Sequence, residues 1–196
     1  MHATQKNLVS REEYLKLERL ADLRSEYHKG QIFAMAGASR NHNRIVTNLS
    51  TSLDIQLKSR DCNNYSSDMR ISVQSGERYL YPDIVVTCGK ETFEDDSNDT
   101  LKNPKVIVEV LSSSTEAYDR GLKFLYYQTI DSLQEYVLIS QHPHRIEVYY
   151  KQADGTWAYR AFNKMPEKIK LQSINCILDT DDIYFKVEGE VEKSYP

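Results

Sequence analysis

Glu109 has the setting that most strongly indicates chemistry, because it is a lone carboxylate inside the apolar run VIVEVL at 106–111. A strand that is apolar at both parities is typical of a strand buried on both faces. A buried carboxylate is costly unless it is paired, hydrogen-bonded or bound to a metal. Glu109 is therefore a candidate functional acid. The alternative is a structural carboxylate satisfied by an arginine or by backbone amides.

A second acid, Asp83, opens another apolar run in the stretch YLYPDIVVT. Pro82 cannot donate a hydrogen bond to a sheet, which predicts a distorted or edge strand at this point. The alternative is a Pro-Asp turn that simply begins a strand. If the two strands are neighbours, joined by the polar, acidic and mobile surface loop expected between them, the two carboxylates converge. Such a pair suits a hard cation such as Mg²⁺, which binds few protein oxygens and keeps several waters.

Lys123 lies after the Glu109 strand, in AYDRGLKFLYYQ, on the border of a helix expected over 116–130. From that border its ammonium can turn toward a site at the sheet. The alternative is a solvated lysine paired with Asp119 four residues earlier, and such pairs contribute about 0.2–0.5 kcal/mol. On a helix surface, Lys123→Ala would change stability by about 0.5 kcal/mol or less. The apolar face of this helix is expected to consist of Tyr118, Leu122, Leu125, Tyr126 and Thr129.

The elements that must position these residues can be predicted from capping and periodicity. Ser10 and Glu13 form a capping box that begins a helix reaching about Arg24, and 26–36 is typical of two short strands. A second helix over 40–59 carries leucines and an isoleucine at four-residue spacing. Further strands are expected at 64–73, 79–87, 105–112, 135–140, 145–151 and 157–162. This order predicts one mixed α/β (α+β) domain over 1–196, with its core at about 10–185 and a frayed tail over 188–196.

The composition excludes several classes of protein. The chain has 196 residues, of which 40% are hydrophobic and 28% charged, so it is long enough and apolar enough to bury a core. No apolar run approaches the roughly 20 residues of a membrane-spanning helix, and the first residues carry no secretory signal. The net charge of −4 argues against a surface coated in positive charge for loose nucleic-acid binding. Three distant cysteines predict neither a disulfide framework nor a zinc site, which fits a cytoplasmic location.

The candidate residues occur in an order that resembles a known superfamily. Pro82-Asp83, Glu109-Val110-Leu111 and Lys123 resemble the PD-(D/E)XK nucleases, in which a Pro-Asp, a second acid and a lysine build a magnesium-dependent phosphodiesterase site. In that superfamily the lysine stands two residues after the second acid, where this chain has Leu111. The resemblance implies that the lysine has moved onto the following helix.

The wider pattern over about 10–185 resembles the Uma-two family, once a domain-of-unknown-function family, whose members are classed as endonucleases. The similar elements also include Glu26-Tyr27, Gly30, Ala36-Gly37, Asp68-Met69-Arg70, Pro104, Tyr118-Asp119-Arg120-Gly121, Tyr126, Leu133, Glu135-Tyr136 and RIEVYY. This resemblance implies a restriction-endonuclease-like core, a mixed sheet flanked by helices, with an N-terminal helix and hairpin.

The resemblance also implies a role for each residue of the site. Asp83, Glu109 and the backbone carbonyl of Val110 would hold Mg²⁺, with Mn²⁺ as a substitute. The metal would polarise the scissile phosphate and lower the pKa of an attacking water. Lys123 would help activate that water or stabilise charge on phosphorus. Glu26 would add a further acid. Its alternative is a strand-end carboxylate in solvent.

Contacts with the DNA substrate are implied for the start of the second helix. The expected phosphate contacts are Arg40, Asn43 and Arg44, with His42 as a further candidate, although a lone histidine more often has a structural role. Arg70 and Arg120 either contact DNA or neutralise Asp68 and Asp119, and we favour the structural role.

Three classes of function remain open from the residues alone. They are a metal-dependent DNA endonuclease, a nuclease-fold protein that binds DNA or a protein partner without cleavage, and an interaction module whose 14 tyrosines serve an interface. A homodimer is predicted from the tyrosine-rich hairpin around 145–162, which includes Tyr149-Tyr150, and from the need of duplex-cutting enzymes to reach two strands. Neither an organic cofactor nor a membrane partner is expected.

Overall fold

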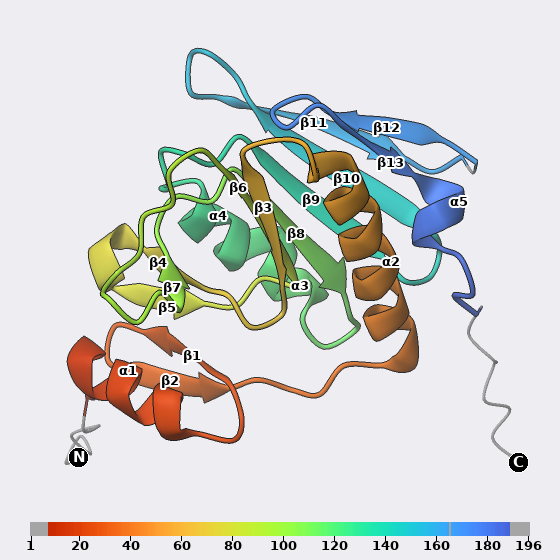
Figure 1. The fold of residues 1–196 in the computed structure, drawn as a ribbon. Helices are drawn as coiled ribbons and strands as arrows, with labels where there is room; N and C mark the ends of the chain where they lie inside the picture. The colour runs from red at the N-terminus through yellow and green to blue at the C-terminus, as the bar shows by residue number, and fades with distance from the viewer. Residues whose placement is uncertain (1–7, 165, 189–196) are drawn as a thin grey trace, which may run out of the picture.

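A six-stranded mixed sheet forms the centre of the computed structural model, which describes residues 8–164 and 166–188 (Figure 1). The strand order is β11-β10-β9-β8-β6-β3, in which β8 and β9 are parallel and the other neighbours antiparallel. The strands are β3 (Cys62–Ser66), β6 (Ile84–Cys88), β8 (Val106–Leu111), β9 (Glu135–Ser140), β10 (Arg145–Lys151) and β11 (Trp157–Phe162). The predicted frayed tail lies outside the described residues from 189 onward.

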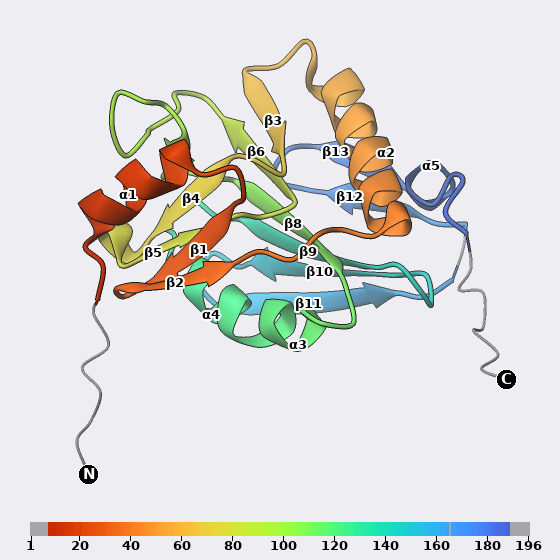
Figure 2. The same ribbon diagram turned by 90° about the horizontal axis from the view of Figure 1, so that it is seen from below.

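Helices cover both faces of this sheet, as Figure 2 shows from below. One face carries α2 (Arg40–Leu57), α5 (Thr180–Ile183) and the hairpin of β12 (Lys168–Leu171) and β13 (Cys176–Asp179). The other face carries α3 (Glu116–Tyr118), the π-helical turn η2 (Asp119–Lys123) and α4 (Phe124–Tyr127). Alternate β8 residues therefore enter two separate cores, with Val108 facing α2 and Ile107 facing α4. No helix in the described ranges is long and apolar enough to cross a membrane.

A second, five-stranded sheet in the order β2-β1-β5-β4-β7 holds the N-terminal part of the chain. Its elements are β1 (Ser25–His28), β2 (Gln31–Ala34), β4 (Arg70–Val73), β5 (Arg78–Leu80) and β7 (Thr100–Leu101), with the short turn η1 (Gln74–Gly76) and helix α1 (Arg11–Leu20). Tyr14 of α1 stacks on Tyr27 and Tyr79, with ring centroids 5.0 and 5.5 Å away. This packing holds α1 against β1 and β5 of the second sheet.

The two strands expected at 64–73 and 79–87 are each two strands, one in each sheet. The chain leaves β3 at Ser67, whose φ of 62° lies in the left-handed region, and enters β4 of the other sheet. It returns from β5 to β6 through Tyr81-Pro82-Asp83, where the sequence predicted a distortion. The strand-like sequence pattern continues from β3 to β4 and from β5 to β6, so it does not indicate that the chain changes sheet between them.

The third helix differs from the expected one in its buried face. Leu122 and Leu125 are more than half exposed, whereas Asp119, Lys123 and Tyr127 are buried. The cause is the π-helical turn, which includes Gly121 and shifts the residues that face the sheet. Such turns are rare and occur frequently at functional sites. The expected apolar face is therefore wrong, and an acid and a lysine lie on the buried side.

The cysteine expectation is also wrong, because Cys62 and Cys88 form a disulfide while Cys176 is free and buried. The two cysteines lie directly opposite one another in the antiparallel pair of β3 and β6. Their 26-residue separation gave no sign of this register. The acidic loop before β8 includes the short strand β7, and Arg19 of α1 binds Asp95 and Asp99 in this loop, each at 2.8 Å.

Candidate active site

Glu109 points from β8 toward α4, on the face shared with Ile107 and Leu111. Its Oε1 atom accepts hydrogen bonds from Lys123 Nζ at 2.9 Å and from the Tyr127 hydroxyl at 3.2 Å. Its side chain is only 3% exposed. Burial raises the pKa of Glu109 well above its ordinary value in spite of the nearby ammonium. Both donors contact the same oxygen, Oε1.

Lys123 is buried at the centre of a group of carboxylates. Its Nζ lies 2.9 Å from Glu109, 3.5 Å from Glu26 and 3.6 Å from Asp119. It also donates a hydrogen bond to the Tyr81 carbonyl at 3.3 Å. Burial alone would lower the pKa of Lys123, but the three carboxylates raise it well above its ordinary value. The alternative of a solvated lysine is therefore wrong, and the side chain carries a fixed positive charge.

Glu26 reaches the same ammonium from β1. Its Oε1 accepts a hydrogen bond from the Tyr81 amide at 3.3 Å, and its Oε2 accepts one from the Tyr118 hydroxyl at 3.2 Å. Burial would raise the pKa of Glu26, but Lys123 and His28 hold it below its ordinary value. Glu26 is buried, so the alternative of a strand-end carboxylate in solvent is wrong.

Asp83 lies between β5 and β6, opposite the end of β8. Its Oδ2 accepts a hydrogen bond from the Val110 amide at 2.7 Å, just before β6 begins at Ile84. Its Oδ1 lies 3.0 Å from His42 Nε2 of α2. Burial would lower the pKa of His42, but the Asp83 carboxylate raises it above its ordinary value. The Asp83 and His42 side chains are 19% and 15% exposed, so they form the more open side of the group.

The three residues expected to contact DNA lie in the first turn of α2, beside His42. Arg40 is exposed and forms an ion pair with Glu188 at 3.1 Å. Asn43 is exposed, and Arg44 is half-buried without a side-chain hydrogen bond or ion pair to the described residues. Among the described residues of this turn, His42 is the one that contacts the carboxylate group, at Asp83.

Arg70 and Arg120 have the structural roles that we favoured, but with other partners. Arg70 is 2% exposed and lies 3.0 Å from Asp99 rather than near Asp68. Arg120 pairs with Glu116 at 2.7 Å and with Glu147, not with Asp119. A buried Arg70 is not available to a DNA backbone.

Asp119 and Tyr127 are members of the site that the sequence reasoning did not select. Asp119 is buried, and burial together with the Asp83 and Glu26 charges raises its pKa despite Lys123. The signal was available, because Asp119, Lys123 and Tyr127 recur at four-residue spacing and therefore share one helix face. Tyr118 and His28, whose side chains lie 3.0 Å apart, complete the surroundings of Glu26.

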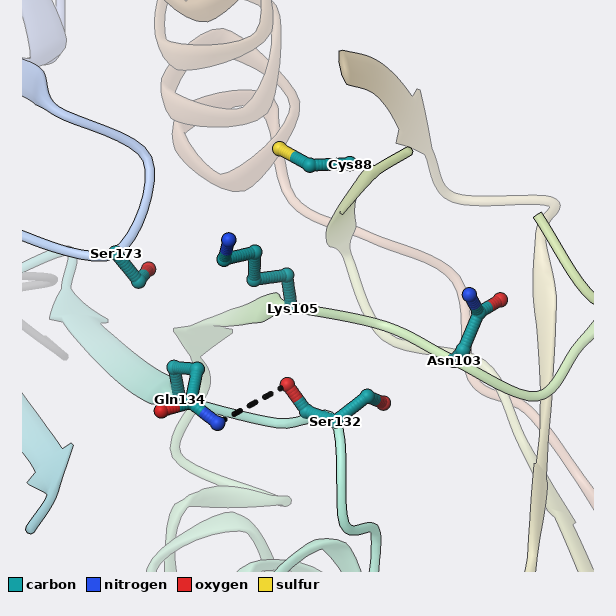
Figure 3. Close-up of a pocket in the computed structure, with 6 residues that line it drawn as sticks. All are labelled: Cys88, Asn103, Lys105, Ser132, Gln134 and Ser173. Atoms are coloured by element: carbon teal, nitrogen blue, oxygen red, sulfur yellow. Dashed lines mark hydrogen bonds between the residues drawn. The ribbon is translucent and has the colours of Figure 1, made fainter. Parts of the chain in front are cut away.

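A pocket of about 420 Å³ lies at the opposite end of β8 and is not part of this group (Figure 3). Its lining residues are Cys88, Asn103, Lys105, Ser132, Gln134 and Ser173. Lys105 precedes β8 and Gln134 precedes β9. Glu109 lies further along β8, and Asp83 contacts Val110 near the far end of that strand. This pocket and the cluster of ionisable side chains are thus separate features.

The donor set of the cluster fits a divalent cation. Four carboxylates, from Asp83, Glu109, Glu26 and Asp119, face one ammonium and one imidazole. The mutual repulsion of these acids contributes to the raised pKa values of Glu109 and Asp119, and a cation would relieve it. No group of three or more His, Cys, Asp or Glu side chains within the described residues is arranged to hold a metal by itself. Mg²⁺ does not need one, because it binds through one or two carboxylates and keeps several waters.

The fold and the cluster together define a restriction-endonuclease-like protein. Its mixed sheet carries an acid before one strand, a second acid in the antiparallel neighbour, and a lysine against the second acid. The chain belongs to the Uma2 family, described as "Putative restriction endonuclease", whose profile matches residues 11–178. The predicted family and fold class are confirmed, and the chain is nuclease-like.

The chain is also similar to two relatives of known sequence and to one solved structure. The uncharacterized protein sll1609 of Synechocystis sp. (strain ATCC 27184 / PCC 6803 / Kazusa) is 42% identical over 150 residues, covering 76% of this chain and 85% of the relative. The uncharacterized protein slr1290 of the same strain is 39% identical over 176 residues, covering 90% and 91%. A crystal structure from Anabaena variabilis ATCC 29413, titled a "putative nuclease belonging to DUF820", superposes with a TM-score of 0.73 and 20% identity, covering 90% of this chain and 97% of that one. At that identity the likeness concerns the fold.

Proposed function

We propose that the chain is a divalent-metal-dependent endonuclease that hydrolyses phosphodiester bonds of DNA. The observation that carries the proposal is the group of carboxylates around Lys123, in which the buried Glu109 lies 2.9 Å from the ammonium and also experiences the Asp83 charge. A buried carboxylate close enough to Asp83 for the two charges to interact suits a shared cation. The family description supports the same class of reaction.

We assign different roles to the two acids and to the lysine. Asp83 and Glu109, with the backbone carbonyl of Val110, would hold Mg²⁺ or Mn²⁺. A bound divalent cation lowers the pKa of a water and offsets negative charge on a phosphate. Lys123 partly offsets the effect of burial on the pKa of Glu109 and supplies fixed positive charge beside it. Because its pKa is raised, Lys123 does not act as a proton acceptor.

The start of α2 is suited to the DNA backbone. Arg40, Asn43 and Arg44 lie at the N-terminal end of an 18-residue helix, where the helix dipole favours phosphate. His42, in the same turn, contacts Asp83. A DNA strand bound along this turn would therefore pass close to the Asp83 carboxylate. Neutralising each phosphate contact should weaken DNA binding across sequences and reduce its salt dependence.

Titration of Mn²⁺ or Mg²⁺ into the purified protein tests the proposal. Glu109→Gln should lose most of the metal affinity and all metal-dependent cleavage of plasmid and linear DNA. Glu135→Gln is the matched control, because Glu135 is also about 2% exposed but pairs with Val106 at the other end of β8. Equal metal binding by wild type and Glu109→Gln would refute the site. Metal and DNA binding without any cleavage would instead identify a non-catalytic nuclease-fold protein.

A further inference from the structure

His42 joins α2 to the first acid of the cluster. Ser39 caps α2 by accepting a hydrogen bond from the His42 amide at 3.0 Å, which fixes the backbone of the first turn. From this turn the imidazole crosses to Asp83, where Nε2 lies 3.0 Å from Oδ1. Both side chains are mostly buried, so water does not readily replace the contact.

Asp83 has its carboxylate positioned by residues from other elements and not by β6. It lies outside β6, directly after Pro82, which cannot donate a backbone hydrogen bond. Its carboxylate is bound from two sides, by the Val110 amide at Oδ2 and by His42 at Oδ1. These two donors come from different elements, β8 and α2, so together they determine both the position and the plane of the carboxylate.

We propose that His42 is a positioning residue, which holds the Asp83 carboxylate in the orientation needed to share a cation with Glu109. The effect on cation binding rests on the proposed function, whereas the contact between His42 and Asp83 does not. Carboxylates that bind metals are commonly fixed by an outer hydrogen bond, and loss of such a partner lowers metal affinity or activity about 10–100-fold. His42 thus acts through Asp83 and not on the phosphate.

Two variants separate the hydrogen bond from the volume of the ring. His42→Phe keeps an aromatic ring but removes the donor, whereas His42→Gln places an amide N–H near the position of Nε2. His42→Phe should weaken Mn²⁺ binding about 10–100-fold, and His42→Gln should retain most of the affinity. Thr47→Ala, at an exposed position one turn further along α2, is the matched control. Equal affinities for His42→Phe and wild type would overturn the proposal.

A metal-free measurement tests the positioning directly. The Val110 amide donates to Asp83 Oδ2, so its hydrogen exchange reports whether that carboxylate stays in place. His42→Phe should accelerate this exchange about 5–10-fold relative to the amide of Val137, which lies in β9 between two strands. His42→Gln should restore the protection. Unchanged exchange in His42→Phe would overturn the proposal, whatever the metal result.

The two measurements also distinguish this inference from the proposed function. If the wild type binds no divalent cation but Val110 exchange responds as expected, the endonuclease proposal fails and the positioning role stands. If Mn²⁺ bound to the wild type shows spin-echo modulation from a directly coordinated imidazole nitrogen, His42 is a ligand, and the positioning role is overturned.

Discussion

Removing the Lys123 ammonium should destabilise the protein far more than the loss of a helix-surface lysine. The side chain is 7% exposed, and three carboxylates lie within 3.6 Å of its Nζ. At an effective dielectric constant of about 20, charges about 3–4 Å apart attract by about 4–6 kcal/mol before desolvation is subtracted. Breaking a buried ion pair by removing one partner costs about 3–5 kcal/mol. We therefore expect Lys123→Met to lower the unfolding free energy by about that amount near neutral pH.

The loss should depend on pH in a defined direction. Burial raises the pKa of Glu109 and Asp119 in the folded protein, and without Lys123 it would raise them further. A carboxyl group with a raised folded-state pKa stabilises the protein below its unfolded pKa, and this contribution is lost as pH rises through the folded-state value. The defect of Lys123→Met should therefore be small near about pH 4 and largest near about pH 8.

Urea unfolding of the wild type and variant at both pH values is the assay. Lys168→Met is the control, because Lys168 also pairs with a carboxylate, Asp179 at 3.5 Å, but is 75% exposed. Its loss should cost about 0.2–1 kcal/mol. A Lys123→Met defect below about 1 kcal/mol near pH 8, or one that is the same at both pH values, would refute the reasoning.

Two further predictions concern other parts of the fold. Reduction of the Cys62–Cys88 disulfide, which closes a 26-residue separation, should lower the unfolding free energy by about 3.5 kcal/mol on the chain-entropy relation. Urea unfolding with and without reductant measures this, and an unchanged midpoint despite two alkylated thiols would contradict it. The protein should also sediment as a homodimer at micromolar concentration. Tyr149 packs internally on Phe124 at 4.4 Å, so we place the contact at the edge strand β11, where Tyr159 is 48% exposed. Tyr159→Lys should then favour the monomer, and a monomeric wild type would rule the dimer out.

The burial of Glu109 could be predicted from the sequence because its neighbours along the strand are apolar. Glu109 is surrounded by β-branched and aliphatic residues, so its strand could only be buried, and a lone acid there needed a partner. Pro82 likewise marked a break that the structure contains. These inferences depend on local patterns of burial and backbone chemistry, which a single sequence carries.

The sequence was not sufficient where the outcome depended on the register between distant segments. The apolar periodicity over 116–130 favours Leu122 as a buried residue, whereas the structure buries Lys123 and leaves Leu122 exposed. No pattern indicates that Cys62 faces Cys88, because their pairing follows from how β3 aligns with β6. The sequence indicated that His42 is a candidate phosphate contact or a structural histidine, and its partner Asp83 could not be predicted because it is 41 positions away.

The position of Lys123 on a helix rather than on a strand determines what holds the carboxylate group together. Leu111, in the superfamily's lysine position, is 4% exposed and packs in the same core as Phe124 and Tyr127. The positive charge therefore crosses from helix to sheet, and its position depends on the packing of α4 rather than on the strand. Tyr127 contributes to both, since it fills that core and donates to Glu109. A substitution that loosens the packing of α4 should therefore weaken both the contacts of Lys123 with the carboxylates and the stability of the fold. If the lysine were on the strand, its position would not depend on α4.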